Sequence, residues 1–159
     1  MLVRIEFVSF AASGEGNSPV VVLKEITGTR LLMLPVGPLE GSVIAMETLG
    51  MNPRKPAAIH VAHRIMEKLG GTLTRAVLYL TTGQTLMARL EIASRGTAAR
   101  IDCRPFDAVV LALRCEAPLL ARESVFGQFC RSGGSPKGDT LRAHIAAIDT
   151  LDFGSYFLE

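Results

Sequence analysis

Three strand-like segments, separated by turns of two or three residues, are the feature that most constrains the fold of this chain. Residues 72–81 and 84–94 are rich in apolar and β-branched side chains and are joined through Thr82-Gly83, a pairing typical of a β-hairpin. Arg95-Gly96-Thr97 then leads into residues 98–103. Connections this short join antiparallel strands, because parallel strands need a crossover of a dozen residues or more. The region therefore predicts an antiparallel meander.

Apolar patterning extends this prediction to most of the chain. We expect the other strands at residues 2–10, 19–26, 30–36 and 118–120, and helices at residues 39–49, 57–69, 106–114 and 122–130. The fold class that follows is α+β, with mostly antiparallel sheet of about six to seven strands packed with three to four helices.

The composition divides the chain into one domain and a tail. Residues 1–130 suit a single domain, and RSGGSPKG (131–138) has the composition of a linker. Residues 139–151 have helical potential, and aromatic residues follow them, so we expect residues 131–159 to be a linker plus a C-terminal appendage. The appendage would dock on the domain or on a neighbouring subunit.

The small net charge and the absence of several sequence motifs argue against several classes of protein. The chain has 159 residues, of which 48% are hydrophobic, and a net charge of only +2, too small to act alone as an electrostatic footprint for nucleic acid. It contains no P-loop, no GxGxxG before a helix, no GxSxG and no CxxC, which disfavours motors, dehydrogenases and serine hydrolases. Its three cysteines have no metal-ligand spacing and read as free thiols. With no apolar run of ~18 residues, we expect a cytoplasmic protein without a membrane partner.

The segment Ile101–Asp107 is the strongest candidate for chemistry. It places Asp102, Arg104 and Asp107 at a strand-to-helix junction. The two carboxylates suit a divalent cation such as Mg²⁺ or Mn²⁺, and the guanidinium suits a phosphate. The same residue types also suit an internal ion-pair cluster that only stabilises the fold. A thermal melt of Asp102→Ala distinguishes the two hypotheses, because loss of a buried partner would lower the melting temperature sharply.

The helix expected at residues 57–69 carries a second candidate. One arc is apolar (Ile59, Val61, Ala62, Ile65, Met66 and Leu69), and His60, His63 and Glu67 share the polar side. These three side chains suit a transition metal or acid–base chemistry. The alternative is the ordinary solvated face of an amphipathic helix.

Taken in order, these segments resemble the bifunctional nuclease family. IDCRPFDAVVLALRCEAPLL is similar to the family signature Ile-Asp-x-Arg-Pro-Ser-Asp-Ala followed by an apolar helix ending in Leu-Arg, with Phe106 in place of Ser. LLMLPVGPLEGSVIAMETLG, RKPAAIHVAHRIMEKLGG and LYLTTGQTLMARLEI resemble the segments upstream, so the likeness covers about residues 1–126. The family's Thr-His-Asp triplet falls on Ala58, Ile59 and His60, which shifts the His by one position.

The resemblance implies hydrolysis of phosphodiester bonds in DNA and RNA, with little sequence preference, by a domain that self-associates. We therefore predict a nuclease, with divalent-metal assistance through Asp102 and Asp107, that forms a homo-oligomer, most simply a dimer. The predicted site residues are Asp102, Arg104, Asp107 and His60 for catalysis, and Arg54, Lys55 and Glu40 for substrate binding. The alternative is a non-catalytic, homo-oligomeric binding or regulatory module in which the Asp-Arg-Asp cluster is structural.

Overall fold

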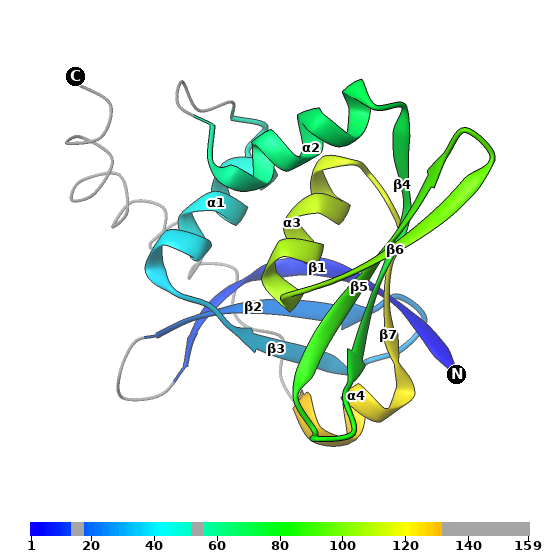
Figure 1. Cartoon of the computed structure of the whole chain (residues 1–159). Coiled ribbons are helices and arrows are strands. Elements are labelled where there is room, and N and C mark those ends of the chain that lie inside the picture. Colours follow the sequence, from blue (N-terminus) through cyan, green and yellow to red (C-terminus); the bar gives the residue numbers. More distant parts are fainter. Residues whose placement is uncertain (14–17, 52–55, 132–159) are drawn as a thin grey trace, which may run out of the picture.

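A computed structural model describes residues 1–13, 18–51 and 56–131 (Figure 1). The predicted site residues Arg54 and Lys55, the linker at 132–138 and the helix predicted at 139–151 lie outside the described residues. The strands are β1 (Leu2–Ser13), β2 (Ser18–Glu25), β3 (Leu31–Pro35), β4 (Gly71–Leu80), β5 (Leu86–Ser94), β6 (Thr97–Cys103), β7 (Leu119–Arg122) and β8 (Cys130–Arg131). The helices are α1 (Pro38–Thr48), α2 (Ala58–Lys68), α3 (Pro105–Arg114) and α4 (Glu123–Phe129).

All the strands belong to one sheet, with the order β6-β5-β4-β7-β1-β2-β3-β8. Every neighbouring pair is antiparallel except β4 and β7, which run parallel. The predicted meander β4-β5-β6 forms one end of the sheet, and a second meander, β1-β2-β3, lies on the other side of β7. The sequence-based prediction of an α+β fold with mostly antiparallel sheet is therefore confirmed.

Helices α1, α2 and α3 gather on one side of the sheet, while α4 packs near β3, β4 and β7 (Figure 1). Helix α3 is the innermost of the three, because its residues Ala108–Ala112 are all buried. They pack against the inward side chains of the strands, which include Leu73, Leu78 and Leu90. The almost wholly apolar sequence of α3 thus predicts its central place correctly.

Helix α2 has the expected bounds but is rotated so that His60 faces the core and part of its apolar arc faces solvent. His60 is only 1% exposed, whereas Val61, Ile65 and Leu69 are 43%, 55% and 66% exposed. The interpretation of the His60 side as a solvated face is therefore wrong for His60. Val61, Ile65 and Leu69 of the apolar arc point outward, whereas Ile59 and Met66 pack against the core. The physical reason is that His60 and His63 have ionic partners inside the domain, and those partners fix the rotation of the helix.

Candidate functional site

Two Glu–Arg ion pairs join α1 to α3 and define the candidate site. Arg104 at the start of α3 donates to Glu40 in the first turn of α1, at 3.0 Å between Nη1 and Oε1. Arg114 at the end of α3 donates to Glu47 near the end of α1, at 2.9 Å. The start of α1 contacts the start of α3, and the end of α1 contacts the end of α3, so the two helices lie side by side and run parallel. We call these the outer pair (Glu40–Arg104) and the inner pair (Glu47–Arg114).

The outer pair includes a second carboxylate on the same guanidinium. Asp107 accepts two hydrogen bonds from Arg104, Nε to Oδ2 at 2.9 Å and Nη2 to Oδ1 at 3.0 Å. Glu40 also accepts the main-chain N–H of Gly37 at 2.9 Å, which caps the first turn of α1. One Arg fork therefore bridges two carboxylates at the place where both helices begin.

This outer cluster of Glu40, Arg104 and Asp107 faces water. The side chain of Arg104 is 65% exposed, against 29% for Glu40. The hydrogen bonds that Arg104 donates to Asp107, with a smaller contribution from Glu40, raise the pKa of the Arg104 guanidinium above its ordinary value. The cluster keeps a permanent positive charge between two negative charges, and all three groups can be reached by a ligand in solution.

Asp102 does not join the outer cluster. Strand alternation directs its side chain to the sheet face opposite α3, where Arg89 on β5 donates to Oδ1 at 2.8 Å. Hydrogen bonds from Arg89 and Tyr79 lower the pKa of the Asp102 carboxyl, and burial together with Asp102 raises the pKa of Tyr79. The structure thus brings Arg104 and Asp107 together, as expected, but places Glu40 beside them where the sequence predicted Asp102.

The sheet face around Asp102 is open and rich in arginine. It holds a groove of about 480 Å³ whose lining includes Arg75, Tyr79, Arg89 and Arg100. Carboxylates balance only part of this charge. Arg75 pairs with Glu91 at 2.8 Å and Arg89 pairs with Asp102, whereas Arg100 lies 3.8 Å from the same Glu91 and Arg122 also lines the groove. This face is a polar surface on which arginines outnumber the carboxylates that pair with them.

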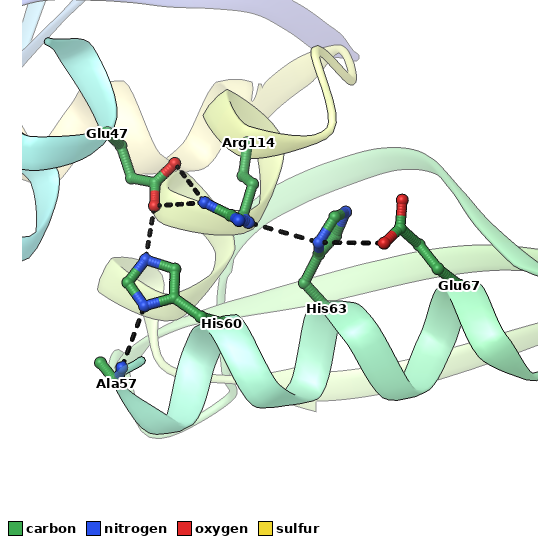
Figure 2. Close-up of polar contacts among 6 residues, drawn as sticks. All are labelled: Glu47, Ala57, His60, His63, Glu67 and Arg114. Atoms are coloured by element: carbon green, nitrogen blue, oxygen red, sulfur yellow. Dashed lines mark hydrogen bonds and ion pairs between the residues drawn. The ribbon is translucent and has the colours of Figure 1, made fainter. Parts of the chain in front are cut away.

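The inner pair belongs to a buried network, shown in Figure 2. Glu47 Oε1 lies 2.6 Å from His60 Nε2, and the main-chain N–H of Ala57 donates to His60 Nδ1 at 3.0 Å. Because Nδ1 accepts a hydrogen bond, the ring proton is on Nε2 and is donated to Glu47. Both ring nitrogens of His60 are therefore occupied, one in starting α2 and one in holding α2 against α1.

The network continues through Arg114 to the edge of the domain. Arg114 Nε donates to His63 Nδ1 at 3.3 Å, and the same Nδ1 lies 3.6 Å from Glu67 Oε2 (Figure 2). His63 and Glu67 line a shallow pocket of about 390 Å³ together with Cys115. Burial raises the pKa of the Cys115 thiol, so this side chain is a poor nucleophile.

The predicted metal sites are not assembled among the described residues. Across residues 1–13, 18–51 and 56–131, no group of three or more His, Cys, Asp or Glu side chains is arranged to hold a metal ion. His60 turns to Glu47, and His63 turns to Arg114 and Glu67, so these residues do not converge on one point. Glu40 and Asp107 are two carboxylates that both contact the guanidinium of Arg104.

Sequence reasoning missed the inner pair. Glu47 has no distinctive spacing in the sequence, and Arg114 entered only as the last residue of an apolar helix. The available signal was that a charged residue at the end of a buried helix needs an ionic partner. The Glu seven positions after Glu40 lies on the same side of α1, two turns later, and was the natural choice.

No helix in the described part of the chain has the length and apolar character needed to cross a membrane.

Comparison with known proteins identifies the domain. Residues 21–131 match the family model described as the bifunctional nuclease domain. Two uncharacterized proteins of Mycobacterium tuberculosis, MT1877 of strain CDC 1551 / Oshkosh and Rv1829 of strain ATCC 25618 / H37Rv, are each 31% identical over 125 residues, covering 79% of this chain and 74% of theirs. The match spans both Glu–Arg pairs and the whole of α3, and the chain therefore belongs to the bifunctional nuclease domain family.

Proposed function

We propose that the chain is a nuclease that hydrolyses phosphodiester bonds of DNA and RNA, with little sequence preference, at the outer cluster of Glu40, Arg104 and Asp107. The observation that carries the proposal is an exposed Arg fork held between two carboxylates, in a chain of the bifunctional nuclease domain family. These groups suit phosphate and cations, which are the same in every nucleotide, so the chemistry does not depend on the base.

Arg104 is the group that binds the phosphate in this proposal. Its planar fork already makes a bidentate contact with Asp107, and a phosphodiester presents two oxygens with similar geometry. Exchange of the carboxylate for the phosphate keeps the fork fully hydrogen-bonded. The guanidinium then neutralises the negative charge that builds on the phosphoryl oxygens in the transition state.

The exchange leaves Glu40 and Asp107 beside an anion, and their repulsion supports the use of a divalent cation. Two carboxylates plus substrate phosphate is a common donor set for Mg²⁺, so the residues present fit such an ion or Mn²⁺. When bound, the ion would lower the pKa of a coordinated water and neutralise the phosphate. Asp102, paired with Arg89 on the far face of the sheet, has no part in this site.

His60 acts in this proposal as a positioning residue. Both of its ring nitrogens are engaged, and its side chain is enclosed, so it has no free nitrogen to relay a proton. It anchors the start of α2 against Glu47, which in turn holds Arg114 and the parallel arrangement of α1 and α3. Changes at His60 should therefore alter stability before they alter the chemical step.

The test is degradation of plasmid DNA and of RNA by the purified chain with Mg²⁺ or Mn²⁺. We expect Arg104→Ala and Asp107→Asn to lose about 100-fold or more of the rate, the loss typical when one group that stabilises transition-state charge is removed. The matched control is Asp102→Asn, an exposed carboxylate in an ion pair on the other face, which should keep nearly full activity. Equal rates for Arg104→Ala and the unaltered chain, all purified identically, would refute the site.

A non-catalytic binding or regulatory module is the second candidate. The observation in its favour is that Glu40, Asp102, Arg104 and Asp107 all have intramolecular ionic partners. In that case every preparation lacks nuclease activity, and the pairs serve only the fold. Melting curves of Arg104→Ala and Asp102→Ala, measured beside the activity assay, then report the only effect of these changes.

A further inference from the structure

Helices α1, α2 and α3 gather on one side of the sheet (Figure 1), and the opposite face of β4, β5 and β6 carries the groove of about 480 Å³. We propose that this groove binds single-stranded nucleic acid. Its lining includes Arg75, Arg89, Arg100 and Arg122 beside Tyr79, and we call it the arginine groove. The binding does not depend on the nuclease cluster; only its link to cleavage rests on the proposed function.

Strand register places charged side chains in a row across the floor of the arginine groove. Glu91 on β5 is in register with Arg75 on β4 and with Arg100 on β6. Their neighbours along the strands, such as Ala76 and Leu90, are buried on the helix side, so the three charged side chains point to the open face. Glu91 is the least exposed of the three, at 21% against 42% for Arg75 and 68% for Arg100. The row therefore presents two arginines to solvent for one carboxylate.

Arg122 extends the positive charge to the end of the groove beside β7. It is exposed, and it forms no ion pair in the part of the chain that the structure describes. Glu123, the second carboxylate in the lining, is bound by Arg30, which lies outside the groove. Arginines that stay exposed after internal pairing attract a polyanion, and their planar forks match the oxygens of a phosphate.

Tyr79 and Arg89 give the groove a flat surface on which a base can stack. The guanidinium carbon of Arg89 lies 5.0 Å from the centroid of the Tyr79 ring. Arg89 is already paired with Asp102, so it offers its plane rather than an unbalanced charge. Proteins bind single strands by stacking unpaired bases on aromatic rings and Arg planes, whereas the bases of a duplex are stacked on one another. This layered pair favours a single strand over a duplex and over an acidic peptide.

The position of the groove suits a strand that continues to the outer cluster. A volume of about 480 Å³ is typical of sites for drug-sized ligands, which is room for about one or two nucleotides, so a longer strand must extend past the groove. Arg100 lies on β6, the edge strand, and Arg104 follows after the strand ends, ~13 Å further along the chain. A few nucleotides that leave the groove over this edge would reach the outer cluster.

Fluorescence anisotropy of the full chain with a labelled single strand of about 12 nucleotides, in EDTA, measures binding without cleavage. We expect an affinity that falls with salt, because each phosphate contact adds about 0.7 to the slope of the log–log plot. Arg100→Ala/Arg122→Ala removes two exposed arginines and should weaken binding by about tenfold or more and lower the slope by about 1.4. Arg64→Ala/Lys68→Ala removes two exposed cations of α2 instead and should change neither quantity.

A second variant tests the stacking surface. Tyr79→Leu keeps an apolar side chain but removes the ring, so we expect about fivefold or more weaker binding of the single strand with little change in the salt slope. A melting curve shows that the variant is folded. A duplex of the same sequence, or polyglutamate, that binds as tightly as the single strand would overturn the proposal. Equal affinities of Arg100→Ala/Arg122→Ala and the unaltered chain would overturn it as well.

Cleavage assays with Mg²⁺ or Mn²⁺ separate this inference from the proposed function. Arg100→Ala/Arg122→Ala should raise KM for single strands and leave kcat nearly unchanged, whereas Arg104→Ala should lower kcat and keep most of the binding seen in EDTA. Binding without cleavage by any preparation would refute the nuclease and leave the arginine groove in place. Cleavage with the same KM in the unaltered chain and in Arg100→Ala/Arg122→Ala would refute the link between the groove and the outer cluster.

Discussion

Replacing Glu47 by Ala removes the carboxylate on which the buried network depends. The side chain of Glu47 is 6% exposed, and its partner Arg114 is 18% exposed. Truncating one member of a buried ion pair costs about 3–5 kcal/mol, because the remaining charge stays buried without a partner. The lost acceptor of His60 Nε2 is part of the same cost. For a chain of this size, each kcal/mol lowers the melting temperature by about 2–4 °C, so we expect a fall of about 6–20 °C.

The outer pair supplies the matched control for this prediction. Glu40 lies on the same helix and accepts from an Arg of the same partner helix, but it faces water. Exposed pairs contribute less than about 1 kcal/mol, and the lost hydrogen bond to the Gly37 N–H costs about 1 kcal/mol more, so Glu40→Ala should lower the melting temperature by at most about 8 °C. Urea denaturation of both variants gives the free energies. Equal destabilisation by the two substitutions, or a change under about 1 kcal/mol for Glu47→Ala, would refute the argument from burial.

Three further predictions concern single groups. Burial, with smaller contributions from Asp107 and Asp102, raises the pKa of Cys103 to about 11. At pH 8 only about one Cys103 thiol in a thousand is then ionised, so its alkylation should be far slower in the folded chain than in the urea-unfolded chain. The hydrogen bond from Arg89 is the main cause that lowers the pKa of Asp102. The stability that this group contributes is therefore present at neutral pH and is lost as the pH falls through its folded-state pKa, which lies below about 3.9. In an NMR titration of Arg89→Ala, the titration midpoint of Asp102 should return toward the ordinary value. Gly70 follows α2 and has φ +75°, so Gly70→Ala should lower the free energy of unfolding by about 1 kcal/mol. Gly127 lies inside α4, where an added methyl group meets no other atom, so Gly127→Ala should leave the free energy of unfolding unchanged or raise it in the same urea assay.

Periodicity predicted the helices and strands well, but it predicted wrongly which side of α2 buries His60 and exposes Val61 and Ile65. The arcs of α2 were correctly separated into apolar and polar, but a helical wheel does not state which arc faces the core. The side of α2 that faces the core is set by the contacts of His60 and His63 with Glu47 and Arg114, which lie 67 positions apart in the sequence. Such a partnership depends on how α1 and α3 pack, and local patterning carries no information about it.

The candidate site shows the same division between local and long-range information. The pairing of Arg104 with Asp107 is three residues apart and follows from a helix start, so the sequence predicts it. Asp102 is two residues before Arg104, yet strand alternation sends its side chain to the other face of the sheet. Glu40 lies 64 positions away and takes the place beside Arg104. A separation of two residues across the end of a strand is therefore poor evidence that two side chains meet.

The four residues of β7 are the only seam between the two meanders among the described strands, since β7 pairs with β1 on one side and with β4 on the other. During synthesis, both facing edges stay unpaired until residue 122 emerges. That is more than a hundred residues after β1 is complete and 42 residues (122 − 80) after β4 is complete. At 5–20 residues per second the ribosome takes roughly 5–20 s to add the residues after β1 and roughly 2–8 s to add those after β4. Strand edges that stay open for seconds invite pairing with other nascent chains. Completion of the sheet is thus set by the pace of translation, and slow codons before β7 would prolong the period in which the chain is prone to aggregate.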